Sequence, residues 1–352
     1  MNAKYDLLFQ PFTFQNGATI KNRISMAPMT TISATEDGRV SAEELSYYAH
    51  RANGIGMVIT GCAHIKADGQ AWERGFAADS DATIHDLTQL ATAIKKQGAK
   101  AILQIFHAGH KSLHASSHSD YIQKLTENEI MQLIHAFSQA TLRAIKAGFD
   151  GVEIHGANGF LIHQFFSQQT NNRKDQFGGS FTNRTTFPLA VVETVLETAR
   201  QYANKSFIVG YRISPEEAGE QGFTMADSLQ LMDQLANTEL SYLHISNGDF
   251  WSLPRRGVEK HHTRMEWIMK KVGERIPLIG VGAIQTADDA LKALQSDIPL
   301  LALGKELLIE PEWIKKIERD EEQNIALRIS PEDQNRLVIP DPMWKKLWES
   351  WL

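Results

Sequence analysis

Cysteine is almost absent from this 352-residue sequence, which contains only Cys62. An internal disulfide is therefore excluded, and so is a cysteine-ligated metal ion or iron–sulfur cluster built from this chain alone. No stretch of about 18 consecutive apolar residues occurs, the length that a membrane-spanning helix needs. The first residues include Lys4 and Asp6 where a signal peptide has a continuous apolar core. These absences predict a cytoplasmic protein without a membrane partner.

An excess of basic residues is also missing. The 36 Lys and Arg residues are outnumbered by 42 Asp and Glu residues, which gives a formal net charge of −6. A nucleic-acid-binding surface needs clustered cations to neutralise phosphates, so this balance argues against nucleic acid and favours a small-molecule partner. Hydrophobic residues make up 42% of the chain, which is ample for a folded core.

Short apolar segments recur along the chain and alternate with longer amphipathic stretches. Eight of them are predicted to be strands, at residues 24–29, 56–61, 101–106, 151–156, 207–214, 242–246, 277–282 and 299–304. Apolar residues at helical spacing predict helices between them, among others at residues 41–53, 84–97, 126–146, 184–203 and 225–237. Eight strand–helix units indicate an α/β fold, a single (β/α)8 TIM barrel.

Two flanking segments complete the expected organisation. The N-terminal piece PFTFQNGATIKNR contains Asn16-Gly17, a pair typical of a two-stranded hairpin, which we expect to close the bottom of the barrel. No low-complexity segment or Pro/Gly linker divides the chain, so we expect one barrel domain over residues 1–320 and a tail over residues 321–352. Tryptophans on one helical face of the tail predict packing on its own barrel or on a neighbouring subunit of a homo-oligomer; they are Trp344, Trp348 and Trp351.

The carboxyl ends of the strands are where the chemistry is expected, because side chains there and in the following loops face the active site of such a barrel. Two of these ends carry glycines, Gly282 and Gly304, and the second is followed by Lys305. Glycine lets backbone N–H groups approach an anion closely, and a helix start adds a positive dipole end. Ordinary turn glycines are the alternative, but two such sites on neighbouring strands favour a phosphate-binding cup.

Gln104 and Arg212 stand near the ends of the third and fifth strand segments. An arginine that faces into a barrel mouth needs an anionic or electron-rich acceptor, and a glutamine offers one donor and one acceptor. An isoalloxazine ring matches this pair, because it has an N3–H donor, two carbonyl oxygens and an N1 that becomes anionic on reduction. An internal ion pair between Arg212 and a carboxylate is the alternative.

Five motifs together resemble the Old Yellow Enzyme family of FMN-dependent NAD(P)H oxidoreductases, particularly its bacterial branch. They are NRISMAPM followed by Thr30, LQIFHAG, EIHGANGFLIHQFFS, NNRKDQFGGSFTNR and LGKELLIEP. The resemblance runs from about Leu8 to about Pro311, and the run from Asn172 to Arg184 is highly specific. It implies bound FMN, NAD(P)H as hydride donor, and ping-pong transfer through flavin N5 to an electron-poor acceptor such as an α,β-unsaturated carbonyl compound.

The resemblance also implies roles for cofactor-binding residues. Thr30 would bind the O4 side of the flavin, Gln104 would hold N3 and O2, and Arg212 would lie at N1 and O2. The other residues predicted to bind the cofactor are expected along the flavin edge, on the barrel rim or at the phosphate. They are Pro28, Met29, Cys62, Gly248, Gly282, Gly304 and Lys305. Lys305 stands where the family commonly has arginine. A guanidinium can bind a phosphate with two parallel hydrogen bonds, whereas the lysine ammonium acts as a single point charge. Cys62 is expected to be a small buried residue and not a redox sensor.

His155 and Asn158 match the family's two donors that hold the carbonyl oxygen of the acceptor, and with Thr30 they are the predicted catalytic residues. Withdrawing electron density through that oxygen activates the conjugated alkene and stabilises the developing enolate. A helix-capping role is the alternative for both side chains. Phe160 replaces a tyrosine that donates a proton in much of the family, and phenylalanine has no hydroxyl. An FMN-binding barrel with weak or no ene-reductase activity is therefore the alternative function.

Two weaker patterns remain. The loop at 247–263 contains Phe250 and Trp251, which are predicted to contact the substrate as part of a lid, although a solvated loop is a close alternative. Four histidines follow the third strand segment with spacings that suggest a metal; they are His107, His110, His114 and His118. No carboxylate joins them in the sequence, so no metal site is predicted.

Overall fold

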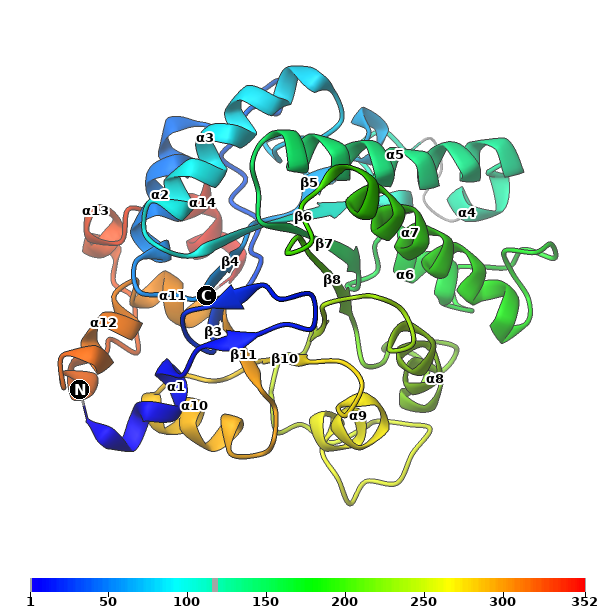
Figure 1. Ribbon diagram of the computed structural model, residues 1–352. Helices are drawn as coiled ribbons and strands as arrows, with labels where there is room; N and C mark the ends of the chain where they lie inside the picture. Colours follow the sequence, from blue (N-terminus) through cyan, green and yellow to red (C-terminus); the bar gives the residue numbers. More distant parts are fainter. Residues whose placement is uncertain (1, 116–119, 352) are drawn as a thin grey trace.

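The barrel is closed by eight parallel strands in the computed structural model, which describes residues 2–115 and 120–351 (Figure 1). The order around the barrel is β4-β3-β11-β10-β9-β8-β7-β6, and pairing of β4 with β6 closes it. The strands are β3 (Ile24–Met26), β4 (Met57–Ile59), β6 (Lys100–Phe106), β7 (Gly151–Gly156), β8 (Ile208–Ile213), β9 (Tyr242–Ile245), β10 (Leu278–Val281) and β11 (Leu300–Leu303). All eight predicted strands are confirmed. A two-residue strand, β5 (Ala63–His64), pairs with β6 and is too short to leave a pattern in the sequence.

Helices form an outer layer around these strands (Figure 1). The longer ones are α2 (Ala42–Ala52), α3 (Ile84–Lys95), α5 (Glu127–Lys146), α7 (Phe181–Tyr202), α8 (Met225–Leu235), α9 (Arg264–Val272) and α10 (Ala287–Leu294). The shorter ones are α1 (Asp6–Phe9), α4 (Tyr121–Lys124), α6 (Leu161–Phe166), α11 (Lys305–Ile309), α12 (Trp313–Glu318), α13 (Gln334–Leu337) and α14 (Asp341–Lys346). Single turns are η1 (Ala3–Tyr5), η2 (Ala67–Gly69), η3 (Asp81–Thr83), η4 (Gly109–Lys111), η5 (Glu322–Asn324), η6 (Pro331–Asp333) and η7 (Leu347–Trp351). The five predicted helices are confirmed, and no helix within the described residues is long and apolar enough to cross a membrane.

Local sequence signals fix where the long helices begin and end. Five of them start with a capping box, in which a Ser or Thr side chain and a carboxylate three residues later satisfy each other's backbone N–H groups. Gly54, Gly98 and Gly148 follow the ends of α2, α3 and α5 with φ of +88°, +78° and +78°. These values are typical of glycine C-caps, because L-residues rarely adopt that conformation.

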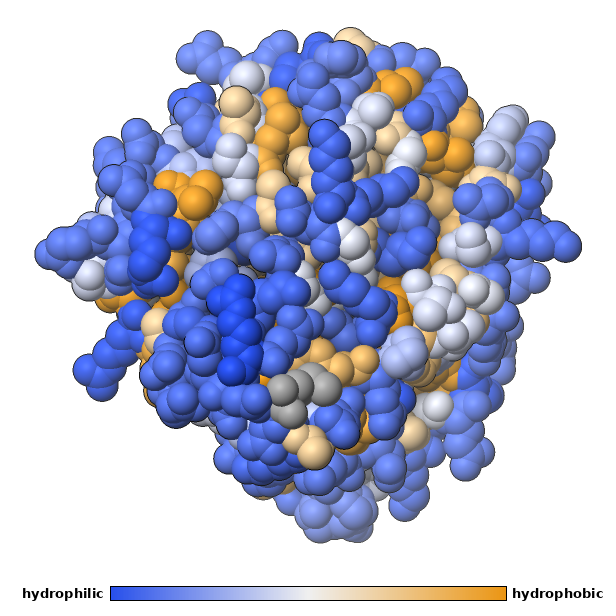
Figure 2. Space-filling model, turned by 60° about the vertical axis from the view of Figure 1, so that its left-hand side comes forward, coloured by the Kyte–Doolittle hydropathy of each residue, from blue (hydrophilic) through white to orange (hydrophobic). Residues whose placement is uncertain are grey.

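Two apolar cores lie on the two sides of the strands. The larger core fills the layer between strands and helices, as the doubly covered strands of a parallel barrel require. The smaller core fills the lower part of the barrel interior, and its members include Met57, Ile102, Ile208, Ile279 and Leu300. The face in Figure 2 is mainly hydrophilic, and its apolar side chains form small separate groups. The strands therefore bury apolar side chains both inward and outward.

The N-terminal hairpin closes the bottom of the barrel, as predicted. Its strands are β1 (Phe12–Thr13) and β2 (Thr19–Ile20), paired antiparallel around the Asn16-Gly17 turn. Phe14 and Ile20 are 2% and 1% exposed and belong to the inner core. The hairpin thus places apolar side chains into the amino ends of the strands and leaves the opposite end for the site.

The C-terminal tail contacts its own barrel. Leu337, Met343 and Leu347 are buried in the outer core, and the carbonyl of Leu337 accepts a hydrogen bond from Arg51 Nη2 in α2 at 2.7 Å. Trp348 remains 43% exposed, and the side chain of Trp351 lies outside the described part of the chain. Contact with a neighbouring subunit and the division at residue 320 stay predictions.

Candidate active site

The carboxyl ends of the strands enclose a cavity of about 170 Å³. It is lined by Pro28, Thr30, Cys62, Trp72, Gln104, His155, Asn158, Phe160 and Arg212. All of these except Trp72 were predicted site residues, so side chains from five strand ends meet at one place. Trp72 lies in the loop between β5 and α3, and only the length of that rim loop could have pointed to it.

His155 lines the cavity as a neutral hydrogen-bond donor. The ring is 4% exposed, and its Nδ1 accepts the backbone N–H of Ala157 at 3.2 Å. Burial lowers the pKa of His155 well below its ordinary value, and the positive charge of Arg212 lowers it further. A neutral imidazole that accepts at Nδ1 carries its proton on Nε2. This nitrogen is left to donate to a ligand.

Asn158 is held in an uncommon backbone conformation with φ of +59°, which asparagine tolerates better than most residues. Its backbone N–H donates to Ser214 Oγ at 3.0 Å, and its carbonyl accepts from Lys111 Nζ at 2.9 Å. Ser246 Oγ donates to Asn158 Oδ1 at 2.8 Å. Because the amide oxygen is occupied by Ser246, the amide nitrogen is left to donate to a ligand in the cavity.

Gln104 and Arg212 form the polar floor of the cavity. Gln104 Nε2 donates to the buried carboxylate of Glu153 at 2.7 Å, which leaves the amide oxygen as an acceptor. Arg212 Nη1 donates to the carbonyl of Pro28 at 3.4 Å, while Arg212 Nε is buried without a partner. Among residues 2–115 and 120–351, no carboxylate lies within ion-pair distance of Arg212. The alternative prediction, an internal ion pair between Arg212 and a carboxylate, is therefore wrong for this part of the chain. An acceptor beside an unpaired guanidinium fits the N3–H and the electron-rich N1–O2 edge of an isoalloxazine.

Phe160 is enclosed by other aromatic rings. It is 8% exposed, and its ring centroid lies 5.0 Å from His155, 5.2 Å from Phe106 and 5.8 Å from Trp72, all in edge-to-face arrangements. The ammonium of Lys111 lies 5.3 Å from the Phe160 centroid, within the range of a cation–π contact. The position that carries the hydroxyl in much of the family is thus an apolar wall here.

The predicted phosphate cup lies on the loops after β10 and β11. Gly282 has φ of +117°, and a Cβ at this position would lie 2.7 Å from the backbone nitrogen of Asp249, so only glycine fits. Gly304 is the N-cap residue of α11, and its N–H donates to the carboxylate of Glu306 at 3.2 Å, while Lys305 is exposed. Gly248 lines a second cavity of about 350 Å³ beside Ser246, next to the first one. None of these four residues lines the smaller cavity. Phosphate binding by Gly282, Gly304 and Lys305 stays a prediction, and so does cofactor binding by Gly248.

Three other predicted site residues are Phe250, Trp251 and Cys62. Phe250 is 1% exposed and its ring packs where Gly280 has no side chain, so it lies in the outer core. Trp251 packs edge-on against Phe250, with Lys292 Nζ 4.5 Å from its ring. Neither ring lines the cavity, and their contact with a substrate stays a prediction. Burial raises the pKa of the Cys62 thiol to about 12, so it remains protonated, 3.9 Å from Thr30 Oγ1.

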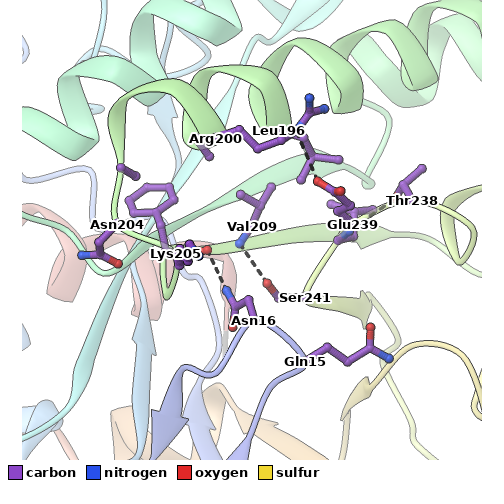
Figure 3. Close-up of a pocket in the computed structure, with 14 residues that line it drawn as sticks. Gln15, Asn16, Leu196, Arg200, Asn204, Lys205, Val209, Thr238, Glu239 and Ser241 are labelled. Carbon is purple, nitrogen blue, oxygen red and sulfur yellow. Dashed lines mark hydrogen bonds and ion pairs between the residues drawn. The ribbon is translucent and has the colours of Figure 1, made fainter.

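No metal site is found in the described part of the chain, in which no three His, Cys, Asp or Glu side chains are grouped to hold an ion. His118 lies outside the described residues. A larger cavity of about 520 Å³ lies between the hairpin turn, the end of α7 and the start of β8 (Figure 3). Its Arg200 is paired with Glu239 at 3.2 Å, and no predicted catalytic residue lines it. The candidate active site is therefore the smaller cavity.

Sequence reasoning missed the residues beneath this cavity. Glu153, Tyr242 and His244 are all fully buried inside the barrel, and Tyr242 and His244 both form hydrogen bonds with the Glu153 carboxylate. Glu153 precedes His155 by two residues, and strand alternation places both side chains on the same face. That spacing was a usable signal for Glu153, whereas nothing local marked its partners.

Comparisons with known proteins agree with this geometry. A sequence model described as the NADH:flavin oxidoreductase / NADH oxidase family matches residues 7–324. The probable NADH-dependent flavin oxidoreductase YqiG of Bacillus subtilis is 45% identical, over 99% of this chain and 97% of that protein. The NADH:acrylate oxidoreductase of Vibrio harveyi is 39% identical over 96% of this chain, which spans only 35% of that longer protein.

Solved structures share the fold. The old yellow enzyme homologue from Zymomonas mobilis has a TM-score of 0.76 and 24% identity, with 95% of this chain and 98% of that chain covered. The sequence match covers both the barrel and the residues that line its cavity. The chain therefore belongs to the NADH:flavin oxidoreductase / NADH oxidase family and is an Old Yellow Enzyme-like oxidoreductase that uses FMN and NAD(P)H.

Proposed function

We propose that the second substrate of this NAD(P)H oxidoreductase is an electron-poor acceptor such as an α,β-unsaturated carbonyl compound, bound in the same cavity in a ping-pong cycle. When bound, FMN supplies N5 as the atom that takes a hydride from NAD(P)H and returns it to the acceptor. Thr30, Gln104 and Arg212 would hold its ring through the free acceptor and donors described above. The name of the Vibrio harveyi relative, which includes acrylate, supports a conjugated alkene as acceptor.

The observation that carries this proposal is the orientation of two donors. Ala157 N–H fixes the His155 tautomer, and Ser246 fixes the Asn158 amide, so that one N–H of each is left for the cavity. Two donors on one carbonyl oxygen withdraw electron density from the conjugated alkene and stabilise the enolate that forms after hydride addition. Because both donors are held before the ligand arrives, little reorganisation is needed at the moment of reaction.

Substitution of the two donors tests the proposal. In His155→Ala or Asn158→Ala we expect kcat/KM for an enone to fall about 10²- to 10³-fold, the usual cost of one oxyanion donor. The rate of flavin reduction by NAD(P)H serves as an internal reference, and His85→Ala on the exposed side of α3 is the matched control. If enone reduction survives both substitutions unchanged, the clamp is not at these residues. If neither NADH nor NADPH bleaches the flavin anaerobically, the reductase proposal itself fails.

A second candidate function follows from Phe160. Its ring lies among Trp72, Phe106 and His155 and offers no proton, so an FMN-binding barrel with weak ene-reductase activity is the alternative. In this case enones would be poor acceptors beside quinones or nitro compounds, which an anaerobic acceptor screen on the reduced enzyme measures. Stopped-flow analysis of Phe160→Tyr completes the test. A faster oxidative half-reaction with enones is expected, and an unchanged rate would remove the argument from the missing hydroxyl.

A further inference from the structure

Glu153 is a fully buried carboxylate that the proposed function does not use. It lies on β7 inside the barrel with 0% exposure, two residues before His155. Its carboxylate accepts hydrogen bonds from Gln104 Nε2 at 2.7 Å, Tyr242 OH at 3.0 Å and His244 Nδ1 at 3.0 Å. Burying a carboxylate costs several kcal/mol unless charges and donors compensate. Three donors from two strands, β6 and β9, supply that compensation here.

The cluster carries one negative charge at neutral pH. Burial raises the pKa of the Glu153 carboxyl, but the hydrogen bonds from His244 and Gln104 and the positive charge of Arg212 outweigh burial and bring it below its ordinary value. Burial lowers the pKa of His244, so the ring is neutral and donates from Nδ1. The nearby opposite charge is the guanidinium of Arg212, which is not in direct contact with Glu153.

Glu153 therefore acts on both flavin-facing groups of the cavity floor. Because Gln104 Nε2 is bound to Glu153, the Gln104 amide cannot rotate freely, and its oxygen is the atom that remains for N3–H. Because the Glu153 charge is close to Arg212, it offsets part of the positive potential that an electron-rich ligand meets. One buried carboxylate thus sets both a hydrogen-bonding direction and a charge balance.

We propose that Glu153, supported by Tyr242 and His244, is a positioning residue that orients Gln104 toward the flavin and lowers the preference of the site for reduced over oxidised FMN. The inference rests on the cofactor roles of Gln104 and Arg212 and not on the identity of the acceptor. Reduced flavin carries extra negative charge at N1, so a carboxylate beneath Arg212 opposes its binding more than that of the oxidised form. A neutral amide of the same size would remove this opposition.

Two substitutions at Glu153 separate charge from orientation. In Glu153→Gln we expect the affinity ratio of reduced to oxidised FMN to rise about tenfold, which is about 30 mV toward positive potential for a two-electron couple. In Glu153→Asp the charge is kept but the shorter side chain loses Gln104. There we expect oxidised FMN to bind several-fold more weakly, with the ratio within about twofold of wild type. The potential is measured by dye-equilibrated reduction and the affinity by flavin fluorescence.

A matched control is available at Glu310. Its carboxylate is 2% exposed and accepts the backbone N–H groups of Glu312 and Ala326, away from the cavity. Glu310→Gln should leave the affinity ratio unchanged, whatever it does to stability. An unchanged ratio in folded, yellow Glu153→Gln protein overturns the proposal. No acceptor is used in this measurement, so failure of an enone screen leaves the result standing.

Tyr242→Phe keeps the test open if Glu153→Gln does not fold. It removes one donor from the carboxylate at 3.0 Å and keeps the charge. The negative charge is then less compensated, so we expect the affinity ratio to fall about two- to threefold, opposite to Glu153→Gln. An unchanged ratio in this variant also counts against the proposal. A double substitution of Gln104 and Glu153 should give a loss of FMN affinity smaller than the sum of the single losses.

Discussion

The lower and upper halves of the barrel interior are built on the same strands and differ in chemistry. The lower half contains the apolar side chains of the inner core and is closed by Phe14 of the hairpin. On β6, Ile102 of the lower half is followed two residues later by Gln104 of the upper half, and on β8 Ile208 is followed by Arg212. Tyr242 joins the halves, since its ring belongs to the inner core and its hydroxyl binds Glu153.

This difference separates the residues that stabilise the barrel from the residues that we expect to bind its ligands. The apolar side chains of the lower half gain their stabilisation from burial and close packing. The upper half instead contains buried polar atoms without partners, Arg212 Nε and His244 Nε2. Unpartnered buried polar groups destabilise the protein, and they persist where a ligand completes them. We therefore expect substitutions in the lower half to change stability and those in the upper half to change cofactor or substrate binding.

Phe14→Ala tests the lower half and has the largest expected effect. The ring is 2% exposed and packs against Phe12 and Tyr242, so its removal leaves a cavity. We expect the free energy of unfolding to fall by about 3–5 kcal/mol, measured by urea denaturation of the FMN-free protein. FMN affinity of the folded fraction should stay within twofold. A loss of affinity in step with stability would show that the two halves are not independent.

Arg212→Met tests the upper half. We expect the affinity for oxidised FMN to fall about ten- to a hundredfold, because a charged hydrogen bond contributes about 1.5–3 kcal/mol. The FMN-free protein should lose less stability than it does in Arg51→Met, since Arg212 Nε has no partner and Nη1 makes one hydrogen bond of 3.4 Å. Arg51→Met is the matched control. Arg51 is fully buried and donates to the carbonyls of Tyr47 and Leu337, so its loss should destabilise the protein and leave FMN affinity unchanged.

Ser246→Ala sharpens the comparison within the upper half. Removing its hydroxyl frees Asn158 Oδ1, so the amide is no longer held with its nitrogen toward the cavity. We expect kcat/KM for the acceptor to fall about fivefold, the equivalent of about 1 kcal/mol, with flavin reduction unchanged. Ser138→Ala, which removes a contact with Thr198 between α5 and α7, is the control. An equal effect on both half-reactions would contradict a role specific to Asn158.

Part of the pH dependence of stability should come from His244 in the upper half, and this is the smallest effect. Burial lowers the pKa of His244 in the folded protein, so the unfolded chain binds its proton more readily. Its contribution to stability is complete above the unfolded pKa of about 6.5 and is lost as pH falls below that value. Unfolding at pH 7.5 and 5.5 should show this loss, and His244→Asn should reduce it. Equal losses in wild type and variant would contradict the prediction.

Most of the fold was predictable from the sequence because its signals are local. Apolar runs marked the eight barrel strands, helical periodicity marked five helices, and Asn16-Gly17 marked the hairpin. The same reasoning placed Gln104, His155 and Arg212 at one rim, because the carboxyl ends of parallel strands meet at one end of a barrel. The predicted lid residue Phe250 shows the limit. Its place in the loop is local information, but its burial depends on the gap left by Gly280 in another strand.

The sequence by itself thus determined the barrel, its closed lower end and the polar residues at its upper end, since strand alternation and helix periodicity follow from neighbouring residues. Only the tertiary structure decided how those polar residues are oriented. Ser246 holds Asn158 across 88 positions, and Tyr242 and Gln104 reach Glu153 across 89 and 49 positions. Such contacts depend on side-chain rotamers and strand register around the closed barrel, and no local pattern in the chain encodes them.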